Sequence, residues 1–174
     1  MMPIPTNKII TLQNTQTVAA LTNRLGTLLS QRQLRLTTAE SCTGGKLGSA
    51  LCAAEDTPTF YGVGFITFTD EAKTRILGVA ERTLEIHTAV SEAVVAEMAT
   101  GAREHADVDI SIAISGYGGP EGGDDGTPAG TVWFAWDIDG AVYTVVQQFS
   151  GECEEVLDQA VRFALAQLLR LLED

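Results

Sequence analysis

The chain of 174 residues has a formal net charge of −12, with 45% hydrophobic and 20% charged residues. This length and composition are typical of one globular domain with a full core, and they exclude a disordered chain. The eleven Lys and Arg residues form too small a cationic footprint for duplex nucleic acid, which excludes that class of partner. A small anionic ligand is still compatible with this charge, because a few local donors can outweigh the field of the whole protein.

The sequence also argues against a membrane or secreted protein. No apolar run approaches the roughly 20 residues of a membrane span, and no signal peptide is recognised at the N-terminus. The three cysteines, Cys42, Cys52 and Cys153, are odd in number and form no C-x-x-C pair, which argues against a disulfide framework or a structural zinc site. We therefore expect a cytoplasmic protein with no membrane partner.

Hydrophobic periodicity and turn residues predict the elements in chain order. Residues 1–15 contain Pro3 and Pro5 and show no periodicity, so we expect a loose lead-in to a domain that spans residues 16–174. The predicted helices cover residues 18–33, 46–54, 70–77, a segment capped by Ser91, and residues 152–172. The predicted strands cover residues 34–39, 60–68, 108–114, 131–138 and 142–149.

This order of elements predicts a single three-layer α/β/α domain with a mixed sheet. The last two strands form a predicted hairpin over Asp139-Gly140, a strong signal for a type I′ turn, so part of the sheet is expected to be antiparallel. Residues 84–90 are predicted to be a connector, from which His87 is a candidate to join the site. The glycine-rich stretch from Ser115 to Gly130 is predicted to be a long loop, a feature that is often functional.

The stretch from Thr38 to Gly45 is a predicted strand-to-helix turn on which a site is centred. Gly44 and Gly45 allow backbone N–H groups to approach a ligand closely, and the helix N-terminus behind them favours an anion. Ser41 is therefore a candidate nucleophile, a candidate anion clamp or an N-cap, and the N-cap is the commonest role for such a serine. Neither this glycine pair nor the stretch 116–121 completes a P-loop or a dinucleotide-binding fingerprint.

Lys73 is a candidate general base for Ser41. It follows the strand predicted at residues 60–68, whose end is expected near the Ser41 turn. A serine with a desolvated lysine as proton acceptor is an established nucleophilic pair, whereas a solvated lysine on a helix surface is the commoner case. Cys42, by contrast, is more often a small buried residue than a nucleophile, because no histidine partner is evident.

Four separated segments together resemble the CinA C-terminal family. They are Ala39-Glu40-Ser41-Cys42-Thr43-Gly44-Gly45, Gly64-Phe65-Ile66-Thr67-Phe68-Thr69-Asp70-Glu71-Ala72-Lys73, Ala89-Val90-Ser91-Glu92, and Ile114-Ser115-Gly116-Tyr117-Gly118-Gly119-Pro120 with Gly130-Thr131-Val132. The resemblance extends from residue 16 to the C-terminus and is specific, because order, spacing and residue types agree. Active members of this family are the PncC enzymes, which are nicotinamide mononucleotide deamidases.

The resemblance implies an amidohydrolase that converts the carboxamide of nicotinamide mononucleotide to nicotinate mononucleotide and ammonia. In this role Ser41 attacks the amide carbon and Lys73 takes or relays the proton, while the N–H groups of Gly44 and Gly45 are candidate oxyanion donors. The resemblance implies no metal and no other cofactor, a pyridine nucleotide as ligand, and a homodimer. The further ligand-binding positions that the family motifs imply are Glu40, Thr43, Ser115 and Gly116.

The chain departs from the family pattern at positions that matter. Phe68 stands where family members usually carry Tyr, and Cys153 stands where active members usually carry Arg at the start of the last helix. Thr88 replaces a usual glycine, and Tyr117 replaces a usual aliphatic residue. Loss of one charge-assisted hydrogen bond costs about 1.5 to 3 kcal/mol, so two such losses are enough to remove useful activity.

These departures are most like those of the divergent stand-alone paralogues of the family, the YdeJ-like branch. The alternative to a deamidase is therefore a catalytically impaired paralogue that binds a pyridine nucleotide or a protein partner without turnover. The deamidase remains the main hypothesis, because Ser41, Lys73, Ser115 and the glycine turns are intact.

Overall fold

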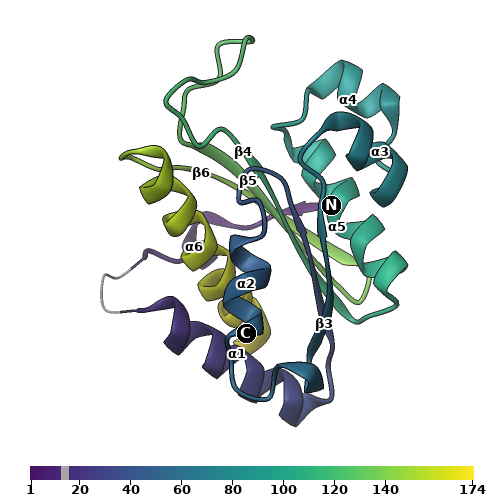
Figure 1. The fold of residues 1–174 in the computed structure, drawn as a ribbon, viewed down its shortest axis with the longest axis vertical. Coiled ribbons are helices and arrows are strands. Elements are labelled where there is room, and N and C mark those ends of the chain that lie inside the picture. The colour runs from purple at the N-terminus through teal and green to yellow at the C-terminus, as the bar shows by residue number, and fades with distance from the viewer. Residues whose placement is uncertain (13–15) are drawn as a thin grey trace.

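The computed structural model describes residues 1–12 and 16–174, so the prediction for residues 13–15 lies outside it. In the described residues six strands form one mixed sheet in the order β1-β6-β5-β4-β2-β3 (Figure 1). The strands are β1 (Met2–Pro3), β2 (Leu36–Glu40), β3 (Tyr61–Ile66), β4 (Ile110–Gly116), β5 (Thr131–Ile138) and β6 (Ala141–Gln148). The helices are α1 (Val18–Arg32), α2 (Lys46–Cys52), α3 (Asp70–Leu77), α4 (Glu81–His87), α5 (Glu92–Ala106) and α6 (Cys153–Glu173).

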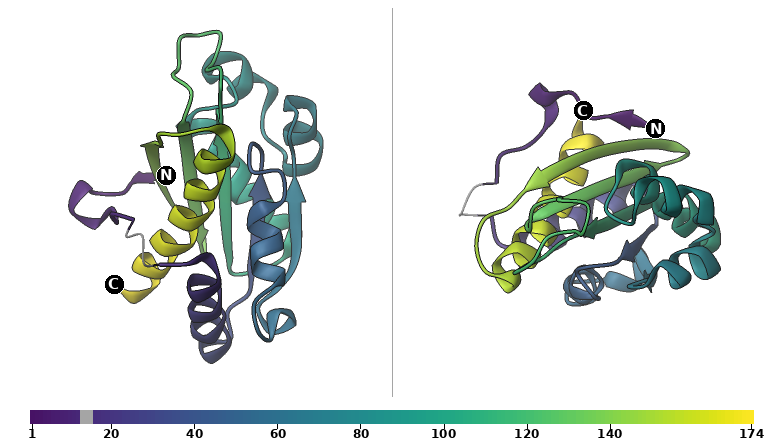
Figure 2. Two further views of the ribbon diagram at one scale, coloured as in Figure 1. Left: turned by 60° about the vertical axis from the view of Figure 1, so that its left-hand side comes forward. Right: turned by 90° about the horizontal axis from the view of Figure 1, so that it is seen from above.

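Helices cover both faces of this sheet, which confirms the predicted three-layer α/β/α architecture (Figure 2). One face packs against α1, α2 and α6, and its core contains the stacked rings of Phe134 and Trp136 together with Phe163 of α6. The indole N–H of Trp136 donates to the Ala164 carbonyl at 3.1 Å, so the donor of this large buried side chain is satisfied. The other face packs against α5 and the end of α3 through mostly small residues.

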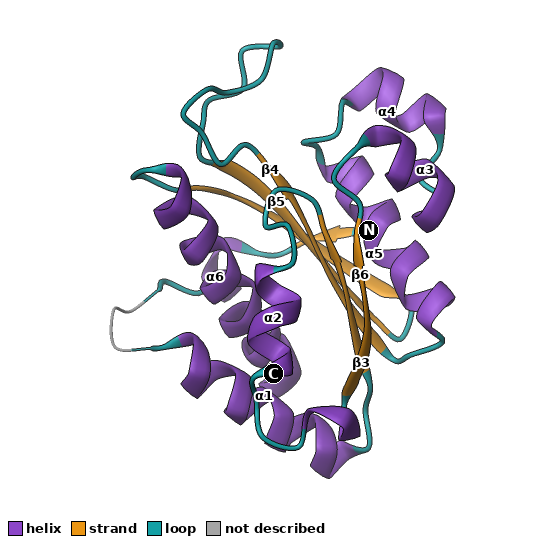
Figure 3. Ribbon diagram, viewed as in Figure 1, coloured by secondary structure: helices purple, strands orange, loops and turns teal. Residues whose placement is uncertain are grey.

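Three neighbouring parallel strands, β4, β2 and β3, position the candidate site, because their carboxyl ends lie at the same edge of the sheet. α2 connects β2 to β3 across one face, whereas α3, α4 and α5 connect β3 back to β4 across the other (Figure 3). The chain after β4 leads away from β2, into the antiparallel strands β5 and β6. The ends of β2 and β4 therefore form a topological switch point, where ligands bind in open α/β sheets.

α6 spans 21 residues and packs one apolar face against the sheet, while acidic and basic side chains follow its exposed side. Within residues 1–12 and 16–174, no helix combines the length and the hydrophobicity that crossing a membrane requires.

The expectation of a connector at residues 84–90 is wrong for its first half, because Glu81–His87 forms helix α4. α4 has no buried residue and no side-chain cap. Apolar periodicity and a capping residue are the signals that predict a helix from sequence, and a helix without an inner face or a cap gives neither. His87 ends this helix with an exposed side chain and does not line the pocket described below.

The expectation of a loose lead-in is also wrong for the part of residues 1–15 that the structure describes. Met2–Pro3 pairs with β6 as a parallel edge strand. The buried amide of Gln167 accepts from the Ile10 N–H at 2.9 Å and donates to the Lys8 carbonyl at 3.1 Å. A polar side chain within the last helix thus holds this segment, and no local pattern in the sequence reveals such a long-range pairing.

The close packing of α5 against the end of α3 depends on Gly101. A methyl group at this position would lie 1.8 Å from the Leu77 carbonyl oxygen, a backbone atom that cannot rotate away. We expect Gly101→Ala to lower the free energy of unfolding by about 2 to 3 kcal/mol, because α5 and α3 must move apart. Chemical denaturation measures this loss. Thr100→Ala, one position earlier on the same helix, is the matched control, with a change below about 1 kcal/mol; an equally small change for Gly101→Ala would contradict the packing.

Candidate active site

Ser41 is the first residue after β2, and its backbone is fixed on both sides. Its N–H donates to the Ile114 carbonyl of β4 at 3.0 Å, and its own carbonyl accepts from the Gly44 N–H at 3.1 Å, which closes the turn. On the other side of β2, the Thr67 N–H donates to the Glu40 carbonyl at 2.9 Å. The candidate nucleophile therefore lies at the switch point between the neighbouring strands.

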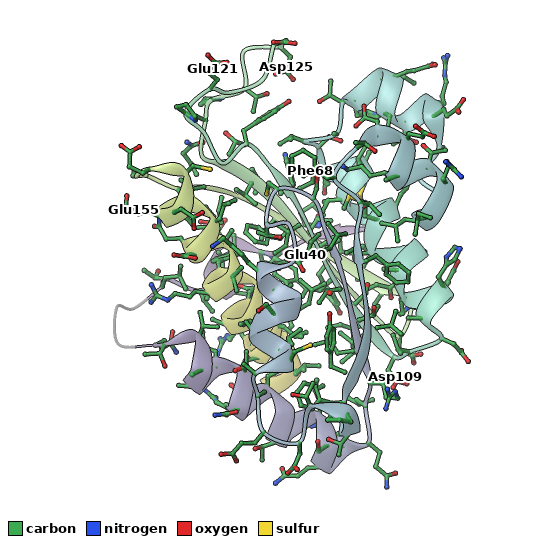
Figure 4. The ribbon with its side chains drawn as sticks, in the orientation of Figure 1. Glu40, Phe68, Asp109, Glu121, Asp125 and Glu155 are labelled. Atoms are coloured by element: carbon green, nitrogen blue, oxygen red, sulfur yellow. The ribbon has the colours of Figure 1, made fainter. Side chains whose placement is uncertain are left out.

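The Glu40 side chain stabilises this turn. It is 1% exposed, and its carboxylate accepts hydrogen bonds from the Thr43 hydroxyl at 2.7 Å and from the Leu47 and Gly48 N–H groups at 2.9 and 3.0 Å. The two N–H groups belong to the first turn of α2, where backbone donors lack partners within the helix. Glu40, seen above α2 in Figure 4, thus holds the Ser41 turn in position together with Thr43.

Lys73 lies in α3 with its side chain entirely buried. Its Nζ donates to Ser41 Oγ at 2.9 Å, to the Thr67 carbonyl at 2.8 Å and to the Phe68 carbonyl at 3.4 Å. Burial lowers the pKa of Lys73 below the ordinary lysine value of 10.5, and the nearby Asp70 carboxylate offsets part of this shift. The structure thus brings the two predicted catalytic side chains into direct contact.

The three partners of Lys73 Nζ determine what the amine can do. The two backbone carbonyls can only accept, so in the neutral amine they take its two N–H groups and the lone pair faces the Ser41 hydroxyl. In this form Ser41 can pass its proton to Nζ while Oγ attacks an electrophile. The arrangement is therefore suited to general-base activation of a serine nucleophile.

Ser41 and Lys73 line a pocket of about 350 Å³, which is within the range of small-molecule sites. Its walls come from the ends of β2 and β4, the segment after β3, the connector before α5 and the start of α6. Within the described residues, no group of three or more His, Cys, Asp or Glu side chains is placed to hold a metal ion. Other lining residues are Cys42, Phe68, Ser115, Gly116, Tyr117 and Cys153.

Ser115 and Gly116, at the end of β4, lie in this pocket beside the catalytic pair. Ser115 Oγ donates to the Ala89 carbonyl at 2.8 Å, so it fixes the connector that forms one wall. Burial raises the pKa of the Cys42 thiol to about 12, so this neighbour of Ser41 stays protonated at neutral pH. Cys42 is therefore a poor nucleophile, and Ser41 is the better candidate.

Gly44 and Gly45, the predicted oxyanion donors, lie beside a different hollow. They line a surface depression between α1, α2 and α6, and the Gly44 N–H already closes the Ser41 turn. The Ser41 pocket is lined instead by Cys42, which follows Ser41 directly, and by Gly116 with the two glycines Gly118 and Gly119.

Three departures from the family motifs, Phe68, Tyr117 and Cys153, lie in the pocket itself. Phe68 is 69% exposed and Cys153 begins α6, and both line the pocket. Figure 4 shows Phe68 at the same end of the molecule as Glu121, on the projecting loop between β4 and β5, and Glu155 on α6. Thr88, the fourth departure, has a φ of 64° and a buried hydroxyl that makes no hydrogen bond to the described residues. A glycine would adopt this backbone without strain, so the usual residue suits the position better.

The partners of Lys73 that the sequence does not reveal are the backbone carbonyls of Thr67 and Phe68. Every residue carries a carbonyl, so no residue type marks these two acceptors. The available signal is the start of α3, where the Thr69 hydroxyl accepts from the Ala72 N–H at 3.1 Å. This cap places Lys73 just after the first turn of the helix, close to the chain that leaves β3.

Comparisons with known proteins agree with the motifs. The model of the CinA C-terminal domain matches residues 18–172. Protein YdeJ of Escherichia coli (strain K12) is 67% identical over 171 residues, which are 98% of this chain and 99% of that protein. The nicotinamide-nucleotide amidohydrolase PncC of the same strain is 42% identical over 149 residues, which cover 85% of this chain and 90% of the relative.

Solved structures give the same result. A competence-damaged protein (CinA) superfamily protein from Escherichia coli superimposes with a TM-score of 0.93 at 68% identity, over 95% of this chain and 96% of that one. The competence/damage inducible protein CihA from Agrobacterium tumefaciens has a TM-score of 0.87 at 31% identity, over 95% of this chain and 100% of that one. The chain belongs to the CinA C-terminal domain family.

Proposed function

We propose that this protein is an amidohydrolase that hydrolyses the carboxamide of nicotinamide mononucleotide or a related small pyridine amide. The observation that carries the proposal is the 2.9 Å hydrogen bond between Lys73 Nζ and Ser41 Oγ, made by a fully buried lysine in a pocket of ligand size. The identity of 42% to a nicotinamide-nucleotide amidohydrolase supports the substrate class.

In the first half of the proposed reaction, neutral Lys73 takes the Ser41 proton while Oγ attacks the amide carbon. The C–N bond then breaks, the Lys73 ammonium returns its proton to the leaving nitrogen, and ammonia departs from an ester on Ser41. In the second half, Lys73 takes a proton from an attacking water and passes it to Ser41 Oγ as the acid leaves. One amide and one water thus give one acid and one ammonia.

The oxyanion that develops in both halves needs N–H donors beside Ser41. Backbone hydrogen bonding by the N–H groups of Cys42 and Gly116 lowers the pKa of the Cys42 thiol, against the larger effect of burial. Their position in the pocket supports these two groups as the oxyanion donors, in place of Gly44 and Gly45.

The proposal extends to a cytoplasmic homodimer that takes part in NAD salvage. The cysteines Cys42, Cys52 and Cys153 are all free thiols, which supports a reducing compartment. Two-fold dimers are the commonest soluble oligomers, which supports the dimer.

A second candidate function is binding of a pyridine nucleotide or a protein partner without turnover. It is favoured by Phe68, which brings no phenol to the pocket, and by Cys153, which brings no cation to it. A missing phenol removes a donor near the catalytic pair, and a missing guanidinium removes a charge-assisted contact to phosphate.

We expect Ser41→Ala to abolish ammonia release, and Lys73→Met to lower kcat about a thousandfold, because the nucleophile then has no proton acceptor. Methionine is apolar and close to lysine in length, so it suits this buried position. Lys46→Met is the matched control: its side chain lies outside the pocket in a partly exposed ion pair with Glu154, and its rate should stay within about twofold of the wild type. Ammonia release by Ser41→Ala at the wild-type rate would contradict the nucleophile.

The pH dependence of the reaction follows from the direction of the Lys73 shift. The ammonium form cannot accept the Ser41 proton, so kcat/KM rises with pH as Lys73 loses its proton and levels off above its pKa. Because burial lowers this pKa below 10.5, the plateau is reached at lower pH than an exposed lysine would give. Measuring kcat/KM from about pH 6 to about pH 10 checks this; a rate that falls throughout the range would exclude Lys73 as the base.

Reversal of the two departures separates the two candidate functions. If the wild type releases no ammonia from nicotinamide mononucleotide, the double variant Phe68→Tyr with Cys153→Arg should gain activity, because it regains a phenol and a phosphate contact. A gain of at least about tenfold over background, lost again with Ser41→Ala, would establish that these two departures remove turnover of the mononucleotide. Activity in the wild type itself would exclude binding without turnover.

A further inference from the structure

The exposed charge among the described residues that line the pocket of Ser41 and Lys73 is negative. Among its described lining residues, Lys73 is the one cationic side chain, and it is buried against Ser41. Glu121 adds an exposed carboxylate to the lining from the projecting loop. Lys46 lines the neighbouring depression instead, where it is paired with Glu154 at 2.8 Å. The pocket therefore offers a phosphate no cationic partner apart from the base itself.

The N-termini of α6 and α2, two of the helices at this end of the sheet, are already occupied by carboxylates of the chain itself. α6 starts at Cys153 in the pocket wall, and a capping box closes its first turn. The Glu152 side chain accepts from the Glu155 N–H, and the Glu155 carboxylate accepts from the Glu152 N–H at 2.8 Å. At α2, Glu40 fills the corresponding position. A phosphate at either helix would have to displace an internal anion and meet like charge.

Two aromatic side chains, Phe68 and Tyr117, line the same pocket. Burial raises the pKa of Tyr117, and Coulomb repulsion from the Asp125, Asp124 and Asp70 carboxylates raises it further. Aromatic rings attract a cation through their negative faces, and carboxylates attract it by direct Coulomb interaction. This combination favours a positively charged aromatic ligand.

We propose that the pocket selects a cationic pyridinium carboxamide without a phosphate, the N-ribosyl nucleoside, over the corresponding nucleotide. This inference rests on the proposed hydrolase function and narrows its substrate class. The pyridinium ring carries one positive charge in both compounds, whereas the nucleotide adds a phosphate of about −1.5 to −2 at neutral pH. The nucleoside therefore approaches the acidic pocket as a cation, and the nucleotide approaches it as a net anion.

The test compares ammonia release from nicotinamide riboside and from nicotinamide mononucleotide, which carry the same carboxamide and differ by the phosphate. We expect kcat/KM to be at least about tenfold higher for the riboside, mostly through a lower KM, because the phosphate is remote from the bond that breaks. The preference should shrink with added salt, because the acids at the pocket mouth act partly through solvent.

Three variants test the physical cause of the preference. Cys153→Arg places a cation in the pocket wall and should lower the ratio of the two kcat/KM values at least about tenfold. Cys52→Arg adds the same charge at an exposed cysteine outside the pocket, and it should leave the ratio within about twofold. Glu121→Gln removes the lining carboxylate at an exposed position and should lower the ratio about threefold. This variant tests the charge preference independently if Cys153→Arg does not fold.

Binding of the same two compounds to the Ser41→Ala variant, measured by calorimetry, separates this inference from the hydrolase. Ammonia release with the mononucleotide equal or preferred overturns the inference and leaves the hydrolase in place. No ammonia release from either compound, with the riboside bound at least about tenfold more tightly, overturns the hydrolase and supports the charge selectivity. Equal binding or no binding, together with no ammonia release, overturns both.

Discussion

Lys73 Nζ is shielded from water and donates hydrogen bonds to one hydroxyl and two backbone carbonyls. These contacts constrain where the segments around the amine can lie. An ammonium buried without a carboxylate in contact is costly, so burial favours the neutral amine. The acceptors come from the turn after β2 and from the chain that leaves β3, which must therefore stay in register with each other. Hydrogen bonds between these two strands and from Ser41 to β4 provide that register.

Carboxylates serve two different purposes around this amine. Glu40 is buried, and its carboxylate holds the first turn of α2 and thereby the serine. Glu152 and Glu155 are exposed, and each carboxylate accepts a hydrogen bond from the backbone N–H of the other, which caps the first turn of α6. The chain thus keeps the predicted catalytic pair, whereas Cys153 brings no cation to the pocket at the position where the family resemblance implies an arginine.

Much of the fold could be predicted because its signals are local. α3 has the predicted bounds, since Thr69 caps its start and Gly78 ends it in the left-handed conformation. α4 was not predictable, because a helix with no buried residue has no apolar face. The contact between Lys73 and Ser41 followed from the order of the strands and from family motifs. The side of the turn that Gly44 faces depends on the packing of α2 against α6, which no local pattern encodes.

The small contribution of α3 and α4 to the core has a consequence for cooperativity. α3 buries two of its residues and α4 buries none, so this helical pair is held by far less apolar surface than the sheet. Segments with so little burial open at lower free energy than the global transition. Such an opening would carry the amine into water, where it regains its ordinary proton affinity, while the strands and the serine stay native. The proposed activity would then depend on a sub-global folding equilibrium, and denaturant would abolish it before the sheet unfolds.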